Sequence, residues 1–265
     1  MLSVCATPIG NLEDVTLRVL RELREADVIL CEDTRRTRVL LDRHGIRGTL
    51  VSYHEHNEAK RTAELVPRLV AGERVALVTD AGMPGVSDPG ARLIVAALDA
   101  GAPVTVLPGP SAVETALVAS GLVSERYQFV GYLPRGEKAL ATFWDDVSRW
   151  TWPVVAFESP RRLPRTLRSL AAALPERRAA VCRELTKAFE EVARGTAEEL
   201  AAKFAEPPKG EIVLVLGASE APVDTAAGVD AVVELVGAGI PRRQAAAVVA
   251  RLTGASRNAL FEASL

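Results

Sequence analysis

Short apolar runs alternate with amphipathic, helix-spaced segments along the first 110 residues. Residues 75–78, for example, have the β-branched content of a buried strand, and a Gly-rich turn and an amphipathic stretch follow them. Strands that alternate with helices predict a parallel sheet with helices on both faces. The predicted strands are residues 2–7, 26–31, 50–53, 75–79 and 103–107, and the predicted helices end near residues 25, 43, 70 and 98.

The pattern is interrupted after this point and then resumes. The Pro- and Gly-rich residues 108–111 punctuate the chain, and the pattern changes after Gly121. We place a domain boundary at residues 110–125, which predicts one α/β domain over residues 1–115 and a second over residues 116–218. The predicted strands of the second domain are residues 128–132, 152–158, 179–183 and 210–216, and the predicted helices are residues 112–120, 160–174 and 196–204.

The last segment, residues 219–265, is predicted to be a small helical extension. Small residues and prolines at 217–225 indicate a linker, and glycines at 237–239 and 253–254 separate three short helical patterns. Three short helices with tight turns are typical of a helix-turn-helix unit. The predicted helices are residues 227–236, 241–252 and 256–263.

Composition excludes several classes of protein. Hydrophobic residues make up 48% of the 265 residues, which is ample for a core, and the net charge of −2 gives no global field that would recruit nucleic acid. The apolar settings of Cys5, Cys31 and Cys182 favour reduced core thiols of a cytoplasmic protein over disulfides or a metal site. No apolar run is long enough for a membrane span, and no secretion signal precedes the first strand.

A metal site is disfavoured elsewhere as well. His54 and His56 could lie on one face of a strand, but no cysteine or third histidine neighbours them in the sequence. We therefore interpret this segment as a solvent-exposed or RNA-facing loop, and we expect no metal.

Three loops follow strands of the first predicted sheet and could form a ligand site. They are residues 7–11, 79–90 and 108–112, and in a parallel sheet all three lie at the carboxyl edge. None carries a Rossmann GxGxxG or a Walker GxxxxGK[ST] motif, which disfavours a dinucleotide or a nucleoside triphosphate. Loops rich in Gly, Pro and Ala suit a compact ligand that is bound largely by backbone.

Seven motifs in order carry a family resemblance: ATPIGNLEDVTLR, CEDTR, TDAGMPGVSDPG, LPGPSA, FESPRRL, CRELTKAFEE and KGEIVLVL. The chain resembles the class III (tetrapyrrole methylase-like) S-adenosylmethionine methyltransferases, in particular the branch that methylates the ribose 2′-hydroxyl of a cytidine in 16S ribosomal RNA. The resemblance implies an α/β fold of two domains, each a mainly parallel or mixed sheet flanked by helices, with S-adenosylmethionine in the interdomain cleft. It also implies a cytoplasmic homodimer that acts on 16S ribosomal RNA or the 30S subunit.

The same resemblance assigns residues to the cofactor site. The first loop would contribute one residue, the two other loops of the first domain would wrap the methionine and ribose parts, and the second domain would close the cleft. The residues implied are Pro8, Asp80, Ala81, Gly82, Met83, Ser87, Ser111, Ala112, Phe157, Glu158, Ser159, Gly210 and Glu211.

Transfer of a methyl group to a ribose hydroxyl requires in-line positioning, and a general base can assist it. The candidates for a catalytic role are Lys187, Glu158 and Asp33. Each has an alternative: Lys187 could contact a phosphate, Glu158 could bind a hydroxyl of the cofactor, and Asp33 could cap a helix.

Arginine clusters predict an RNA surface despite the neutral total charge. One cluster follows the second strand, one lies at residues 161–168 with the i, i+4, i+7 spacing of a single helical face, and one lies in residues 240–261, where acidic residues are absent. The arginines assigned to RNA binding are Arg35, Arg36, Arg161, Arg165, Arg242, Arg243 and Arg257.

Two other functions remain open from the sequence. One is methylation of a small molecule or of a diphthamide precursor on a protein, which the lack of a GxGxGDP-like first loop and the basic C-terminal segment disfavour. The other is a non-catalytic RNA-binding or assembly factor on a decayed enzyme scaffold, which the intact glycines and prolines of all three loops disfavour.

Overall fold

The computed structural model describes three stretches of the chain, residues 1–219, 225–253 and 255–265. Most of the linker predicted at residues 217–225 therefore lies outside the described residues, as does Gly254. Within the described stretches, no helix is both long and apolar enough to cross a membrane.

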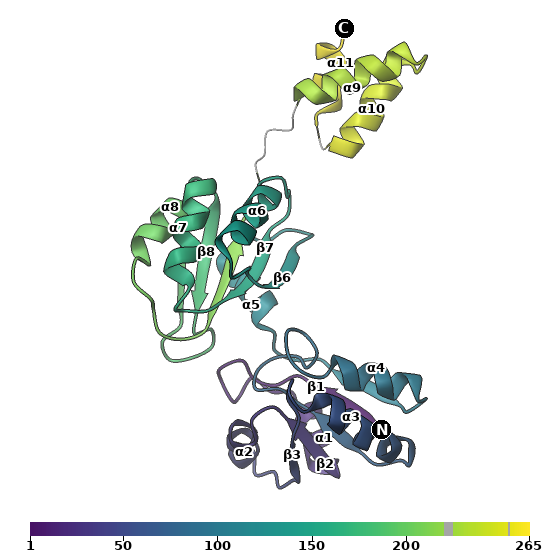
Figure 1. The fold of residues 1–265 in the computed structure, drawn as a ribbon, viewed down its shortest axis with the longest axis vertical. Helices are drawn as coiled ribbons and strands as arrows, with labels where there is room; N and C mark the ends of the chain where they lie inside the picture. Colours follow the sequence, from purple (N-terminus) through teal and green to yellow (C-terminus); the bar gives the residue numbers. More distant parts are fainter. Residues whose placement is uncertain (220–224, 254) are drawn as a thin grey trace. The chain divides into compact units, whose positions relative to one another are not determined.

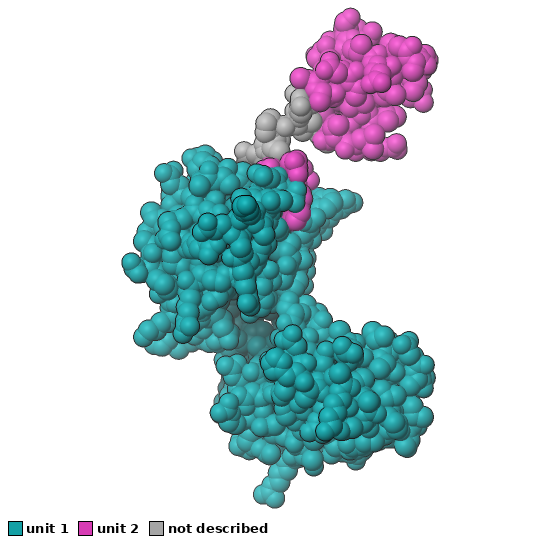
Figure 2. Space-filling model, viewed as in Figure 1, with its two compact units in different colours: residues 1–147, 152–218 teal, residues 148–151, 219–265 magenta. Residues whose placement is uncertain are grey.

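The described residues form two compact units (Figure 2). The larger unit holds residues 1–147 and 152–218 and contains two five-stranded sheets, whereas the smaller holds residues 148–151 and 219–265 and contains three helices. The predicted division of the two sheets into separate domains at residue 115 stays a prediction.

The N-terminal sheet is parallel throughout, in the order β3-β2-β4-β1-β5 (Figure 1). Successive residues of one strand serve two cores: Val28 and Leu30 pack on the face that α3 and α4 cover, and Ile29 and Cys31 pack on the face of α1 and α2. The predicted α/β organisation is confirmed. The strands are β1 (Leu2–Cys5), β2 (Val28–Cys31), β3 (Leu50–Ser52), β4 (Val75–Leu77) and β5 (Val104–Leu107), and the helices are α1 (Leu17–Glu25), α2 (Thr34–Arg43), α3 (Glu58–Val70) and α4 (Ala91–Asp99).

Two of these four helices begin with side-chain caps, and the other two, α3 and α4, do not. Thr16 accepts a hydrogen bond from the backbone N–H of Val19 at the start of α1, and Asp33 accepts one from the N–H of Arg35 at the start of α2. Helix α4 begins after Gly90, which has φ 136° and offers no side-chain cap. The motif Ser87-Asp88-Pro89, which is typical of a helix N-terminus, precedes α4, but no side chain of that motif caps the helix.

The second sheet is mixed, in the order β6-β7-β10-β8-β9, with β6 parallel to β7 and the other pairs antiparallel. Helix α5 follows β5 in the chain, yet its Val113 and Leu117 pack with Val155 and Val213 of this second sheet. The strands are β6 (Gln128–Tyr132), β7 (Val154–Glu158), β8 (Arg178–Arg183), β9 (Glu191–Thr196) and β10 (Ile212–Leu216), and the helices are α5 (Ala112–Ser120), α6 (Glu137–Ser148), α7 (Leu163–Ala173) and α8 (Ala197–Lys203).

Two of these elements were not predicted. Helix α6 buries Leu140, Trp144 and Val147, whose spacing of four and three residues is that of a helix face. Strand β9 has the polar sequence EVARGT, and it forms because it pairs along its whole length with β8 at the edge of the sheet. The apolar period of β9 is too weak to show before its partner is known.

The smaller unit packs three helices around a core of Val232, Ala245, Ala246, Val249 and Leu260. Small side chains let the helices approach closely, since a Cβ at Gly228 would lie 2.8 Å from Leu260. The three helices predicted for this part of the chain are confirmed. They are α9 (Thr225–Gly237), α10 (Arg242–Thr253) and α11 (Arg257–Ala263).

Candidate active site

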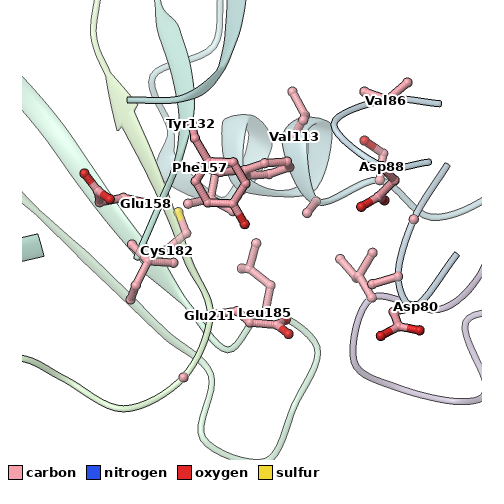
Figure 3. A pocket seen from close by; sticks show the side chains of 18 of the residues that line it. Asp80, Val86, Asp88, Val113, Tyr132, Phe157, Glu158, Cys182, Leu185 and Glu211 are labelled. Atoms are coloured by element: carbon pink, nitrogen blue, oxygen red, sulfur yellow. The ribbon is translucent and has the colours of Figure 1, made fainter. Parts of the chain in front are cut away.

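Loops at the ends of both sheets surround a cavity of about 550 Å³ (Figure 3). The N-terminal sheet contributes residues that follow β1, β2, β4 and β5, which share one edge because the strands are parallel. The second sheet contributes residues at the ends of β6, β7 and β8 and at the start of β10. The volume lies within the range of roughly 300–1,000 Å³ that is usual for small-molecule and cofactor sites.

Most of the residues assigned to the cofactor lie together in this cavity. Two do not: Pro8 lines a smaller neighbouring pocket with Arg36 and Asp80, and Ser87 is exposed outside the lining. The assigned residues that line the cavity are Asp80, Ala81, Gly82, Met83, Ser111, Ala112, Phe157, Glu158, Ser159, Gly210 and Glu211.

The first two predicted loops are joined by backbone hydrogen bonds. The N–H of Thr7 donates to the carbonyl of Gly82 at 2.9 Å, and the N–H of Gly82 donates to the carbonyl of Thr7 at 3.0 Å. The Thr7 hydroxyl also donates to the carbonyl of Thr79 at 3.0 Å. Gly82 has φ 79°, a conformation that other residues rarely adopt, so the glycine allows this pairing.

Asp80 ties the loop after β4 to the start of α2. Its carboxylate accepts a hydrogen bond from the backbone N–H of Asp33 at 3.1 Å and forms an ion pair with Arg36 at 3.2 Å. The Asp33 carboxylate itself faces away to Arg35 and does not line the cavity. Hydrogen bonds from the side chain and backbone of Arg35 hold the pKa of Asp33 well below its usual range.

Three carboxyl groups, Glu32, Asp80 and Asp88, line the same part of the cavity. Burial and then the negative charge of Glu32 raise the pKa of Asp88 to about 6. Burial and then the charge of Asp80 raise the pKa of Glu32 as well. In Figure 3, Asp80 and Asp88 lie on one side of the cavity and Phe157 lies on the other. This side of the cavity therefore favours a cationic ligand.

Glu158 lies buried at the end of β7 and is fully engaged by the protein. One oxygen accepts a hydrogen bond from the N–H of Ser159 at 2.6 Å and faces Arg162 at 3.3 Å. The other accepts a hydrogen bond from the hydroxyl of Thr166 at 2.6 Å. These contacts join β7 to the first turns of α7.

Lys187 lies near the cavity but does not line it. Its ammonium donates to Glu184 at 2.8 Å and to Glu211 at 3.1 Å. Burial lowers the pKa of Lys187, but the hydrogen bonds to the two carboxylates outweigh burial and raise it above the usual value. The Glu184 side chain packs directly against Gly210, where an added Cβ would lie 2.5 Å from the Glu184 Cδ.

An aromatic pair lies at the second sheet's side of the cavity. A bulge in β6 between Phe129 and Tyr132 includes Gly131 at φ 65°. Bulges of this kind redirect a side chain, and Tyr132 lies 63% exposed with its ring 5.6 Å from that of Phe157. Sequence reasoning missed Tyr132, because its register depends on the bulge.

The predicted arginines lie in several places. Arg35 is 89% exposed, and Arg36 lines the cavity. The expectation that Arg161 and Arg165 share a helix face is wrong, because α7 begins at Leu163 and Arg161 lies in the turn before it. In the smaller unit, Arg242 is half-buried and Arg243 and Arg257 are exposed.

Two family models match the chain. The model for tetrapyrrole (corrin/porphyrin) methylases matches residues 1–201. The model for the RsmI C-terminal HTH domain matches residues 222–265. Together they match most of both compact units, and residues 202–221 lie outside both matches.

Curated relatives match over similar lengths. The ribosomal RNA small subunit methyltransferase I of Mesorhizobium japonicum is 46% identical over 263 residues, which is 98% of this chain and 90% of that protein. The protein of the same name from Thermotoga maritima is 43% identical over 220 residues, which is 83% of this chain and 99% of that protein.

Solved structures share the fold. The uroporphyrin-III-C-methyltransferase of Thermus thermophilus matches with a TM-score of 0.57 and 25% identity over 82% of this chain and 93% of that one. A diphthine synthase matches with a TM-score of 0.63 and 16% identity over 82% of this chain and 89% of that one.

Proposed function

The chain belongs to the tetrapyrrole methylase family and, within it, to the ribosomal RNA small subunit methyltransferase I group, and on this premise we propose that it methylates the ribose 2′-hydroxyl of a cytidine in 16S ribosomal RNA. The methyl donor is S-adenosylmethionine. The observation that carries the proposal is the 46% identity to such a methyltransferase along 98% of the chain, the C-terminal helical segment included.

The cavity fits this cofactor. Its volume suits a nucleoside joined to an amino acid, and a ligand can approach the backbone at Gly82 and Gly210 closely because neither residue has a side chain. The carboxyl groups on one side suit the positive charge of a sulfonium. The cofactor supplies an activated methyl group on that sulfonium. We propose that the assigned residues that line the cavity hold it, with Pro8 and Ser87 acting from outside the lining.

The catalytic roles of Lys187, Glu158 and Asp33 stay predictions, and the contacts favour other roles. A general base must be unprotonated so that it can accept the proton of the substrate, whereas two carboxylates keep Lys187 protonated. Glu158 has a donor or an arginine at both oxygens, and Asp33 caps α2. We propose that Glu158 and Asp33 hold the loops in place and that Lys187 presents its charge to the substrate.

We propose that the arginines assigned above bind the RNA. Exposed guanidinium groups supply the phosphate contacts that position a folded RNA without reading its sequence. In the smaller unit, the basic helix α10 carries Arg242 and Arg243, and α11 begins with Arg257. We further propose that the substrate is the 30S subunit or its RNA, that the protein works as a homodimer, and that it acts in the cytoplasm, where ribosomes are made.

One experiment tests the proposed function directly. Labelled S-adenosylmethionine is incubated with the protein and 30S particles, free 16S RNA or a porphyrinoid, and the methyl group is then mapped. We expect label on the 2′-oxygen of one cytidine. Label on the porphyrinoid and none on RNA refutes the proposal, and binding of 30S without any transfer supports a non-catalytic factor instead.

A further inference from the structure

The motif Ser87-Asp88-Pro89 does not use its carboxylate to cap a helix. Such a motif ordinarily begins a helix, with the Asp or Ser side chain accepting a backbone N–H. Here α4 begins after Gly90 without a side-chain cap. Asp88 instead lines the cavity, opposite Phe157 (Figure 3).

The other carboxylates of the cavity are mostly paired with cations. Asp80 pairs with Arg36 at 3.2 Å, Glu211 with Lys187 at 3.1 Å, and Glu158 with an arginine at 3.3 Å. Among the described residues, no ion pair involves Asp88 or Glu32. Nor do the described residues form a group of carboxylates, histidines or cysteines that could hold a metal ion. Asp88 and Glu32 are therefore the two cavity carboxylates that can accept a proton without breaking an ion pair.

The surroundings distinguish these two groups. Burial and the charge of Asp80 raise the pKa of Glu32, and the guanidinium of Arg36 offsets part of that rise. Asp88 faces only acidic groups, Glu32 and Asp80, apart from the hydroxyl of Thr79, and its pKa of about 6 makes it a stronger base that is still ionised at neutral pH. Tyr132, on β6, feels the negative charge of Asp88.

The position of Asp88 is open to a substrate. The turn that carries it adjoins the bulge of β6, since a Cβ at Gly131 would lie 3.6 Å from the Ser87 hydroxyl. Tyr132, which follows Gly131, is 63% exposed and lines the same cavity. A ribose that enters beside this aromatic ring would lie in the cavity that Asp88 lines.

We propose that Asp88 is the general base that accepts the proton of the ribose 2′-hydroxyl during methyl transfer. The proposal rests on the proposed function. The 2′-oxygen forms a bond to the methyl carbon as the bond between that carbon and the sulfonium sulfur breaks, and the electron pair of that bond stays on the sulfur. The hydroxyl proton passes to an Asp88 carboxylate oxygen and later to solvent. The products are the 2′-O-methyl ribose, the neutral thioether and a protonated Asp88.

Asp88→Asn and Glu32→Gln form a matched pair, because each removes one negative charge from the same group of carboxyls. With 30S particles and labelled S-adenosylmethionine, we expect Asp88→Asn to lower kcat by about 10²–10⁴-fold, the usual contribution of a general base. Glu32→Gln should cost less than about tenfold and should shift the lower inflection of the pH–kcat profile to lower pH, because a negative charge beside Asp88 is gone. The profile of Asp88→Asn should lack that inflection.

Two further measurements distinguish a general base from a structural residue. They also distinguish a failure of this proposal from a failure of the proposed function. S-adenosylhomocysteine should bind Asp88→Asn as it binds the unmodified protein, and without cofactor the variant should melt at a higher temperature at pH 8 but not at pH 4. Asp88→Asn with an unchanged inflection and kcat within about fivefold overturns the proposal, as does an equal loss in Glu32→Gln. If the unmodified protein methylates no RNA, the proposed function fails. The melting comparison then still reports whether the pKa of Asp88 is raised in the folded protein.

Discussion

Replacing Gly210 with alanine should loosen the edge of the cavity that the Glu184 carboxylate holds. Gly210 has φ 100°, and a Cβ there would overlap Cγ of Glu184 and lie 2.5 Å from its Cδ. The carboxylate that must move accepts the backbone N–H of Glu211 at 2.9 Å and the ammonium of Lys187 at 2.8 Å. The substitution therefore disturbs both the backbone and the charges beside the cavity.

The expected cost has two parts. An alanine in this conformation loses roughly 1–2 kcal/mol relative to glycine, and forcing a packed neighbour aside costs about 1–3 kcal/mol more. Gly72→Ala is the matched control, because Gly72 has φ 98° and nothing within 4 Å of the added Cβ. We expect Gly72→Ala to lower the free energy of unfolding by the first part only, and Gly210→Ala to lower it by both.

Urea unfolding followed by tryptophan fluorescence measures this difference in the free energy of unfolding. Titration calorimetry measures the affinity of the cavity for S-adenosylhomocysteine. Gly210→Ala should lower the affinity for the ligand, because Gly210 and Glu211 line the cavity, whereas Gly72→Ala should leave it unchanged. Equal losses of unfolding free energy in the two variants, together with equal affinities, would refute the assigned role of Glu184.

Three further predictions concern charge. Glu158→Gln should lower the free energy of unfolding by about 2 kcal/mol in chemical denaturation, because the donors around a buried carboxylate lose charge-assisted hydrogen bonds; an unchanged midpoint would contradict this. Asp88→Asn should stabilise the protein at pH 8 and not at pH 4: the folded-state pKa of Asp88 is raised from 3.8 to about 6, so its penalty is absent below the lower value and complete above the higher one. That rise corresponds to roughly 3 kcal/mol, and because the residue is only half-buried we expect about 1 kcal/mol in the difference between the two unfolding curves. Arg242→Ala and Arg243→Ala should each reduce the slope of log affinity for 30S particles against log salt by roughly one, and a filter-binding series in which both slopes stay unchanged removes these arginines from the RNA surface.

The order of elements could be predicted because its signals are local. Buried parallel strands are short apolar runs, and amphipathic helices have their own period, so the first sheet needs no information from distant residues. The convergence of the loops after β1 and β4 also followed from the sequence, since parallel strands place those ends at one edge, and the hydrogen bonds between Thr7 and Gly82 confirm it. The grouping of cofactor residues rested on the family resemblance, not on the periodicity.

The features that could not be predicted depend on distant partners or on a single backbone angle. The sequence offered Lys187 as a candidate base, but its ammonium donates to Glu184 and to Glu211, which is 24 residues away in the chain. Strand β9 needs β8 beside it. The motif around Asp88 is typical of a helix start, but the N-cap residue of α4 is Gly90, with φ 136°, so the Asp88 carboxylate does not cap the helix.

The distribution of charge separates the two tasks of the protein. The cavity carries Glu32, Asp80, Asp88 and Glu211, so it repels the phosphates of an RNA and admits a cationic ligand or a neutral ribose. We therefore expect the exposed arginines, such as Arg35, to hold the backbone of the RNA outside the cavity, with Arg36 at the cavity lining. Once the methyl group is transferred, the ligand has lost its positive charge, and the same carboxylates no longer attract it. A cavity of this charge thus favours the donor over the spent product, and it leaves the choice of acceptor to the surfaces around it.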